Sequence, residues 1–170
     1  MRIGNYKIES FLDEVASKNP TPGGGAVAAL TGAIAASLIE MVVNLTKGDP
    51  TSLNPPAGRA GLCGARAKIL RVRLLGLADE DCKVFDAVVL AYRAKDKLKI
   101  KKALLGAIEI PEETKKLSKE VGELAKVVAK VGNKNAVSDA KTAVHLARAA
   151  AKSAEENIKI NRTALKKLGS

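Results

Sequence analysis

Residues 24–46 form the most constraining stretch of the sequence, because in a helical projection they are apolar nearly all round. A helix without a polar face has to be covered on every side, which places it in the middle of a bundle. Ala28, Gly32 and Ala36 recur at every fourth position, so one face is small enough for a neighbouring backbone to come close. The chain is therefore expected to build a helical bundle around this segment.

The same segment is not expected to cross a membrane. Its most apolar part, residues 26–39, contains Thr31 and Ser37 and stops at Glu40. That length is short of the roughly 20 residues that a transmembrane helix needs. We therefore expect a buried helix and no membrane partner.

The composition agrees with a helical core. Hydrophobic residues make up 46% of the 170 positions, whereas aromatic residues make up only 2%. The core must then be built from Ala, Leu, Val and Ile packed at short distances, a composition that favours helices. The length suits one domain, residues 1–170, that buries roughly 70% of the surface of its unfolded form.

Helical spacing of apolar residues recurs along the rest of the chain, and no useful length of strand-like alternation interrupts it. Pro111 stands where a helix can start, followed by two glutamates in the first turn. Residues 51–61 are expected to be a loop, and the lysine-rich residues 95–102 a solvated helical face or a connector. The apolar stripes exceed what one copy can bury, which suggests an oligomer. The prediction is an all-α bundle of about five to six helices around the central apolar helix, with helices at residues 8–15, 24–46, 64–95, 111–131 and 137–168.

The formal net charge of +11 implies an acidic partner, which could be nucleic acid, an anionic membrane or a small polyanion. Proteins usually bind single-stranded nucleic acid on aromatic side chains. This chain offers only Phe11, Phe85, Tyr6 and Tyr92, at least two of them on apolar helix faces. Nucleic acid is therefore not expected as the partner.

The two cysteines, Cys63 and Cys82, form no Cys-x-x-Cys motif and have no cluster of His or Cys nearby. Neither a structural metal nor a disulfide is expected. Because no secretory signal is evident, we expect the chain in the reducing cytoplasm.

Asp81 is the most unusual charge in the sequence. Projected at 100° per residue, the helix around it has an apolar face about 160° wide, and Asp81 falls near the centre of that face. An isolated buried charge is costly, so two interpretations remain open. The carboxylate pairs with a Lys or Arg of a neighbouring helix, or burial sets its pKa so that it can give and take a proton near neutral pH.

Pro22, Gly23, Gly24 and Gly25 stand directly before the apolar helix. Glycine loses more backbone entropy on ordering than any other residue, so three in a row suggest a backbone that must approach something closely. The segment is not a nucleotide loop, because GxGxxG and Gly-Lys-Ser/Thr are both absent. Exposed amides at a helix start can still bind a carboxylate or a phosphate.

Several polar residues lie in or beside the last two helices. Asn157 and Asn161 are one helical turn apart at the apolar seam of the last helix. They either fix the register between helices or frame a flat polar ligand. Residues 133–139 begin that helix and carry more polar side chains than a helix cap requires.

Five blocks occur in order over nearly the whole chain: residues 22–29, 41–46, 81–85, 133–140 and 157–161. They read PGGGAVAA, MVVNLT, DCKVF, NKNAVSDA and NIKIN. Together they resemble the formiminotetrahydrofolate cyclodeaminase and methenyltetrahydrofolate cyclohydrolase family. The resemblance implies an all-helical homodimer that acts on one-carbon forms of tetrahydrofolate without a metal or redox cofactor.

The same resemblance implies roles for individual residues. Asp81 matches the acidic position of the family and becomes the general acid and base. The glycine amides would reach the folate, and an acidic polyglutamate tail on that folate would account for the charge of +11. The substrate-binding residues that the resemblance implies are Pro22, Gly23, Gly24, Gly25, Asn44, Asn133, Asn135, Ser138, Asp139, Asn157 and Asn161.

The chain departs from the family at two loops. Members carry further basic residues and a Tyr where this chain has Asp49 and Pro50, and Leu-Pro-Lys where it has residues 93–96. Loops near a pocket tune specificity, so the choice between the two activities and between folate and a related pterin stays open. The alternative function is a non-catalytic basic helical module that binds an anionic partner.

Overall fold

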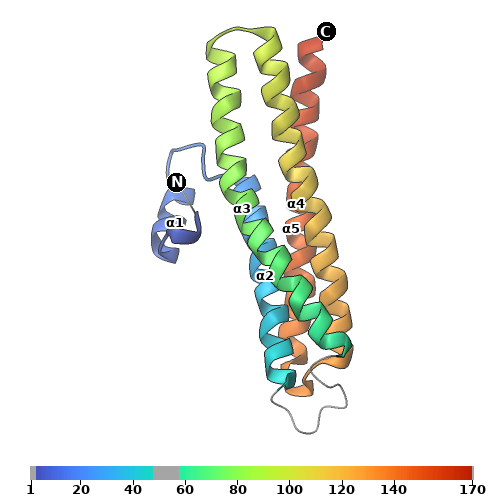
Figure 1. Ribbon diagram of the computed structural model, residues 1–170. Helices are drawn as coiled ribbons and strands as arrows, with labels where there is room; N and C mark the ends of the chain where they lie inside the picture. Colours follow the sequence, from blue (N-terminus) through green and yellow to red (C-terminus); the bar gives the residue numbers. More distant parts are fainter. Residues whose placement is uncertain (1–2, 48–57, 170) are drawn as a thin grey trace.

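The computed structural model describes residues 3–47 and 58–169 (Figure 1). These residues are almost entirely helical and contain no strand. The all-α prediction is confirmed, with five α-helices in the described part of the chain. In order, the elements are a 3-10 turn at Ile3–Asn5, α1 (Ile8–Ala16), α2 (Gly24–Lys47), α3 (Arg59–Arg93), α4 (Lys97–Val131), a second 3-10 turn at Lys134–Ala136, and α5 (Val137–Gly169).

The long helices α3, α4 and α5 run side by side along the whole molecule, whereas the shorter α2 covers only one half of it (Figure 1). Helix α1 stands to one side of the bundle (Figure 1). One half of the molecule is therefore a four-helix bundle and the other a three-helix extension. The N-terminus of α2 marks the boundary between them.

Helix α2 is the central apolar helix that the sequence predicts. It contacts α3, α4 and α5, and Ala28, Gly32 and Ala36 on its inner face are all buried. A Cβ atom at Gly32 would lie only 2.8 Å from Oγ of Ser118 on α4. The small residues therefore let the two helix backbones approach, as the spacing predicts.

By length and hydropathy alone, α2 could also cross a membrane, over Gly24–Thr46. This stretch is longer than residues 26–39, so the length argument against a membrane span is wrong. In the fold, its inner face packs against three other helices. Its half-buried Glu40 accepts a hydrogen bond from Nε of Arg71 on α3 at 2.6 Å.

Pro111 does not start a helix, contrary to the sequence prediction. It lies buried inside α4, which continues from Lys97 to Val131. Proline lacks the N–H that would bond to the carbonyl four residues earlier, here that of Ala107. Nδ2 of Asn161 donates to that carbonyl at 2.7 Å instead. A partner from α5 thus takes the place of the missing backbone donor.

The two predicted connectors differ from the structure in extent. Helix α3 begins at Arg59, so residues 59–61 belong to it rather than to the predicted loop, and residues 51–57 of that loop lie outside the described residues. The lysine-rich segment is a short turn followed by the first turns of α4. Asp96 caps this helix by accepting hydrogen bonds from the amides of Leu98 and Lys99.

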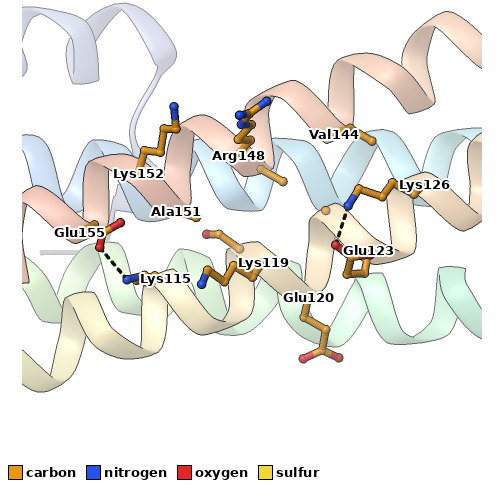
Figure 2. Close-up of a pocket in the computed structure, with 13 residues that line it drawn as sticks. Lys115, Lys119, Glu120, Glu123, Lys126, Val144, Arg148, Ala151, Lys152 and Glu155 are labelled. Atoms are coloured by element: carbon orange, nitrogen blue, oxygen red, sulfur yellow. Dashed lines mark hydrogen bonds and ion pairs between the residues drawn. The ribbon is translucent and has the colours of Figure 1, made fainter.

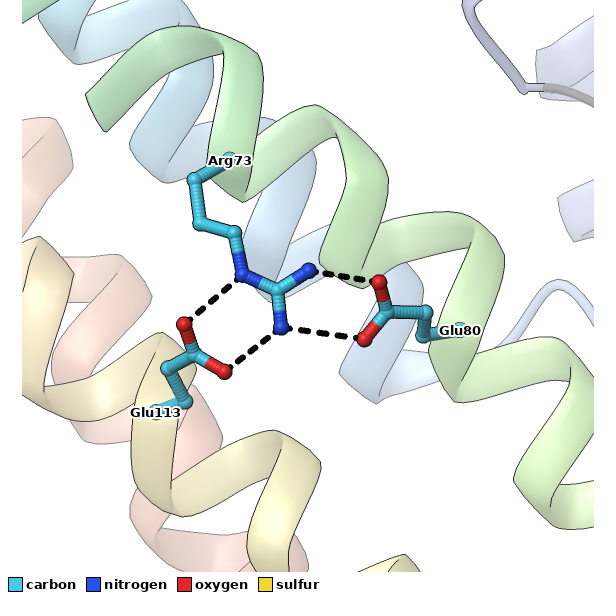
Figure 3. A network of polar contacts seen from close by, with 3 residues as sticks. All are labelled: Arg73, Glu80 and Glu113. Carbon is cyan, nitrogen blue, oxygen red and sulfur yellow. Dashed lines mark hydrogen bonds and ion pairs between the residues drawn. The ribbon is translucent and has the colours of Figure 1, made fainter. Parts of the chain in front are cut away.

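A three-residue ion network joins α3 to α4 (Figure 3). The guanidinium of Arg73 lies between Glu80, about two helical turns further along α3, and Glu113 on α4. Its Nε donates to Glu113 at 2.7 Å and its Nη1 to Glu80 at 2.5 Å. The guanidinium holds the pKa of Glu113 below its usual value. All three side chains are more than a third exposed, so the network adds little to the stability of the fold and mainly fixes the positions of these side chains.

Candidate functional site

A cleft of about 340 Å³ opens where α2 begins, between α3 and α5. It exists because α2 starts only at Gly24, which leaves the next turns of α3 without a fourth helix over them. Its floor comes from α4 and its rim from the segment that precedes α2. The lining residues are Pro20, Thr21, Gly23, Gly24, Gly25, Asp81, Val84, Phe85, Val88, Tyr92, Leu104, Ala107, Asn157, Ile160, Asn161 and Ala164.

Among the described residues that line the cleft, Asp81 is the one charged side chain. It projects from α3 to the first turn of α2, where the backbone N–H of Ala26 donates a hydrogen bond to its carboxylate. Burial raises the pKa of Asp81, and the hydrogen bond from Ala26 opposes this effect in part. No ion pair to Asp81 occurs among residues 3–47 and 58–169. Of the two interpretations, the structure favours a carboxyl whose proton affinity is set by burial.

The glycine segment allows the close approach that its composition suggests. A Cβ atom at Gly25 would lie 2.1 Å from Oδ1 of Asp81, so only glycine lets the carboxylate rest on the helix backbone. At Gly24 a Cβ atom would lie 3.7 Å from Nδ2 of Asn157, an ordinary contact distance. The group that needs space beside Gly25 is thus the chain's own carboxylate.

Asn157 and Asn161 reach the cleft from α5. Nδ2 of Asn157 donates to the carbonyl of Ser153 in its own helix at 2.9 Å. Nδ2 of Asn161 donates across to Ala107 of α4. Both amide nitrogens therefore have partners in the protein, which leaves the two amide oxygens as acceptors. The contact of Asn161 with α4 also fits the predicted alternative of a register-fixing asparagine.

The cleft combines one titratable carboxyl, two amide side chains and apolar walls. This set can bind a flat, partly polar ring and move protons on it. The sequence matches the family described as Formiminotransferase-cyclodeaminase over residues 7–168. The chain belongs to this family. The resemblance drawn from its five sequence blocks is confirmed.

Two relatives of this formiminotransferase-cyclodeaminase family member are similar to it over most of their length. A methenyltetrahydrofolate cyclohydrolase of Methylorubrum extorquens is 40% identical, over 93% of this chain and 80% of that protein. The crystal structure of formiminotetrahydrofolate cyclodeaminase from Thermotoga maritima matches with a TM-score of 0.90 at 29% identity, over 96% of this chain and 82% of that chain. The helical fold is therefore shared along nearly the whole length.

The apolar walls of the cleft include two of the four aromatic residues of the sequence, Phe85 and Tyr92. Phe85 and Tyr92 follow Asp81 on the same face of α3 but are 37% and 47% exposed. The helical projection places them correctly on that face. The projection does not indicate that α2 starts too far along the bundle to cover these two side chains. The sequence therefore does not predict that they can contact a ligand.

Not every predicted binding residue of this family member lies at the cleft. Pro22 lines a neighbouring hollow rather than the cleft. The other five, Asn44, Asn133, Asn135, Ser138 and Asp139, lie at the opposite end of α2. Asn133 contacts that end of α2 directly, because its backbone N–H donates to Oγ1 of Thr46 at 2.8 Å. At 1.5 Å per residue, Thr46 is about 30 Å from Gly25 along the helix.

Part of this distant group has a local structural role. Oδ1 of Asn133 accepts a hydrogen bond from the amide of Asn135, which caps the 3-10 turn before α5. Nδ2 of Asn133 contacts the carbonyl of Leu45 at 3.3 Å. Within one chain, these residues cannot line the cleft at Asp81. Their part in substrate binding stays a prediction.

A second, basic groove runs between α4 and α5 with a volume of about 610 Å³ (Figure 2). Its carboxylates all have partners: Glu155 pairs with Lys115, Glu123 with Lys126, and Glu120 with Arg66 of α3. Within the described residues, no ion pair engages the three remaining cations of this lining, which are Lys119, Arg148 and Lys152. Part of the net positive charge of this family member is thus concentrated here, away from Asp81.

The donor set for a metal is sparse. Among the described residues, no group of three or more His, Cys, Asp or Glu side chains gathers in a way that could hold a metal ion. Cys63 is buried, and Cys82 beside Asp81 in the sequence carries a thiol whose pKa burial raises to about 11. A thiol in this state is protonated at neutral pH and is a poor nucleophile.

Proposed function

We propose that this chain is a one-carbon folate enzyme that uses the cleft at Asp81 to act on a tetrahydrofolate derivative. Of the two activities known among its relatives, methenyltetrahydrofolate cyclohydrolase is the first candidate, because the relative with that name is 40% identical. Formiminotetrahydrofolate cyclodeaminase is the second, supported by the matching fold. The observation that carries the proposal is one half-buried carboxyl, without an ion pair in the described residues, in a cleft of ring size.

In the cyclohydrolase reaction, water adds to the methenyl carbon and the ring opens to a formyl group. The Asp81 carboxylate would take a proton as the water oxygen bonds to that carbon. It would return the proton to the ring nitrogen as the carbon–nitrogen bond breaks, and the second water proton leaves to solvent. A raised pKa makes Asp81 a stronger base than an ordinary carboxylate, which suits this role near neutral pH.

In the cyclodeaminase reaction, N10 of the folate bonds to the formimino carbon and ammonia leaves. The N10 proton has to be removed, and the departing =NH group has to gain two protons to leave as ammonia, one equivalent to the proton lost from N10 and one from solvent. Asp81 can do both in turn, so a single carboxyl serves either reaction. Neither reaction changes an oxidation state, so we expect no redox cofactor. We also expect no metal, because no group of three or more His, Cys, Asp or Glu side chains among the described residues could hold one, and chelators should leave the rate unchanged.

The experiment is to incubate the purified protein with 5,10-methenyltetrahydrofolate and, separately, with 5-formiminotetrahydrofolate while following the methenyl absorbance. Cyclohydrolase activity lowers the absorbance faster than the enzyme-free reaction, and cyclodeaminase activity raises it. Asp81→Asn should lose either activity. Asp86→Asn is the matched control, because Asp86 is an exposed carboxylate on the same helix outside the cleft lining.

A folded protein that turns over neither substrate would favour the alternative of a non-catalytic basic module. The α4/α5 groove is the observation that supports it, because its free cations suit an anionic partner. Binding to nucleic acid in a retardation assay, weakening steeply with salt, would contradict the expectation that nucleic acid is not a partner.

We propose a homodimer because α2 and α3 carry large apolar side chains that are exposed in one copy. Exposed apolar side chains lie on α2, at Ile34, Met41 and Leu45, and on α3, at Leu62, Ile69 and Val72. Ile69 and Val72 are 59% and 60% exposed. Two copies packed through such side chains would bury an apolar surface that one copy leaves in water.

Such a dimer bears on the binding residues that lie far from Asp81. An antiparallel pairing of the two α2 helices would set the C-terminal end of one beside the N-terminal end of the other. Asn44 and residues 133–139 of one copy would then approach the cleft of its partner. This arrangement would bring the two groups of predicted substrate-binding residues together at one site.

The polyglutamate tail and the location in the cell complete the proposal. No Lys or Arg of the part of the chain that the structure describes lines the cleft, so we expect a polyglutamate tail to be held outside it. If the positive charge serves that tail, KM should be lower for a polyglutamate than for a monoglutamate substrate, and the difference should shrink with salt. A cytoplasmic location is consistent with two unpaired cysteines.

A further inference from the structure

Pro111 creates a single gap in the backbone ladder of α4. In an uninterrupted helix, the N–H of residue 111 would donate to the carbonyl of Ala107. Proline has no N–H, and its ring crowds that carbonyl, so a proline at this position is expected to cost stability. The chain nevertheless carries it at a buried position inside the helix.

The carbonyl that Pro111 leaves free lies at the candidate site. Ala107 lines the cleft, as does Asn161 on α5. Nδ2 of Asn161 donates to the Ala107 oxygen at 2.7 Å, in a partly buried contact. A carbonyl oxygen can only accept, so the nitrogen of the Asn161 amide has to face Ala107.

This contact determines the orientation of the whole amide group. With the nitrogen held at Ala107, Oδ1 becomes the acceptor of the side chain, and no hydrogen bond to it occurs within the described residues. Pterin-type rings carry several N–H donors along one edge. An acceptor in a fixed orientation can distinguish such an edge from one that carries only acceptors.

We propose that Pro111 is a positioning residue for ligand recognition: it frees the Ala107 carbonyl, which orients Asn161 so that Oδ1 accepts a hydrogen bond from an N–H of the bound ring. The ligand part of this inference rests on the proposed folate function. The positioning part concerns the protein alone. Asn161 touches the ligand, and Pro111 acts only through Asn161.

The decisive variant is Pro111→Ala, which restores the backbone donor at residue 111. The new N–H should compete for the Ala107 carbonyl and release the Asn161 amide, while α4 becomes more stable. The melting temperature should rise, yet KM should increase about fivefold to tenfold with kcat nearly unchanged, as expected for the loss of one neutral hydrogen bond in binding.

Gly122→Ala is the matched control for added helix stability. Its Cβ atom would lie 3.7 Å from Cβ of Ala147, an ordinary contact, on the same helix and outside the cleft lining. This variant should raise the melting temperature without changing KM. A higher KM in Gly122→Ala would show that stiffening α4 is enough, and would overturn the role of Asn161.

A double-mutant cycle tests whether the effect passes through Asn161. Asn161→Ala should raise KM to a similar extent, and adding Pro111→Ala should then have no further effect. An unchanged KM in Pro111→Ala alone overturns the proposal. A further increase of the same size in the Asn161→Ala background overturns it as well.

Exchange of the Asn161 side-chain amide protons, followed by NMR without ligand, separates this proposal from the proposed function. We expect slow exchange in the wild type and faster exchange in Pro111→Ala. This result in a protein that binds no folate would overturn the proposed function and the ligand part of the inference. Equal exchange rates in both proteins would overturn the positioning by Pro111 even if folate turnover is normal.

Discussion

The carboxylate of Asp81 rests directly on the backbone of Gly25, where an added Cβ atom would lie 2.1 Å from Oδ1. The two residues come from the first turn of α2 and the middle of α3. The amide of Ala26 completes the contact by donating to the same carboxylate. Glycine at position 25 is therefore a condition for the position of the candidate catalytic group.

Gly25→Ala should displace the Asp81 carboxylate and lower turnover by about 100-fold or more, since a shift of about 1 Å at a reacting group can cost that much. Gly76→Ala on α3 is the control, because its Cβ atom would have only ordinary 3.9 Å contacts with Arg73 and Glu80 and lies outside the cleft lining. That variant should fold as well as the wild type and keep most of its activity. Steady-state kinetics on both variants decide the matter, and equal activities would mean that the Gly25 contact is not needed.

Asp81→Asn should reveal the cost of the buried charge through the pH dependence of stability. A carboxyl whose pKa is raised on folding contributes stability that is fully present below its unfolded pKa, near 3.8, and is lost as pH rises through the folded pKa. The stability of Asp81→Asn relative to the wild type should therefore increase with pH across this window and then level off. Chemical denaturation of both proteins at a series of pH values measures the difference. A flat difference would indicate that folding leaves the pKa of Asp81 unchanged.

Glu113 should show the opposite sign. Arg73 lowers its pKa, so the stability that it contributes is present above its unfolded pKa, near 4.5, and is lost as pH falls through the folded pKa. Glu113→Gln should cost less than about 1 kcal/mol at neutral pH, because the partners are more than a third exposed. The cost should shrink in high salt. Denaturation in low and high salt tests both statements, and a loss of several kcal/mol would contradict them.

Ile69→Asp should convert the proposed dimer to a monomer. It places a charge on an exposed apolar face of α3, where a partner copy would have to desolvate it. Leu98→Asp is the control, because Leu98 is 81% exposed at the start of α4, outside that face. Light scattering or sedimentation measures the mass of each variant. A wild-type protein that is monomeric, or an Ile69→Asp variant that stays dimeric, would contradict the proposed interface.

Dimer loss also tests whether the partner completes the site. If residues 133–139 of one copy reach the cleft of the other, a folded Ile69→Asp monomer should lose most of its turnover. A fully active monomer would mean that the cleft of one chain is sufficient. Asn44 and Asn133 would then have no part in catalysis.

The sequence by itself determined the all-helical fold, the central place of α2 and the position of Asp81 on an inward-facing, apolar side of α3. These follow from local rules, because apolar periodicity reports which face of a helix is buried and a charge in that face has to be explained. The five sequence blocks also identified the family. Pro111 was misjudged because a local rule places proline at helix starts, whereas the donor that compensates for it is Asn161, fifty positions later.

Only the tertiary structure decided which of these residues meet. The length of α2 relative to α3 opens the cleft and exposes Phe85 and Tyr92, and neither length is significant until the helices are packed. The same helix, about 36 Å long, separates the Asn133 group from Asp81 within one chain. Periodicity fixes the direction in which a side chain leaves its own helix, but the distance between two helices' side chains depends on the packing of the whole bundle.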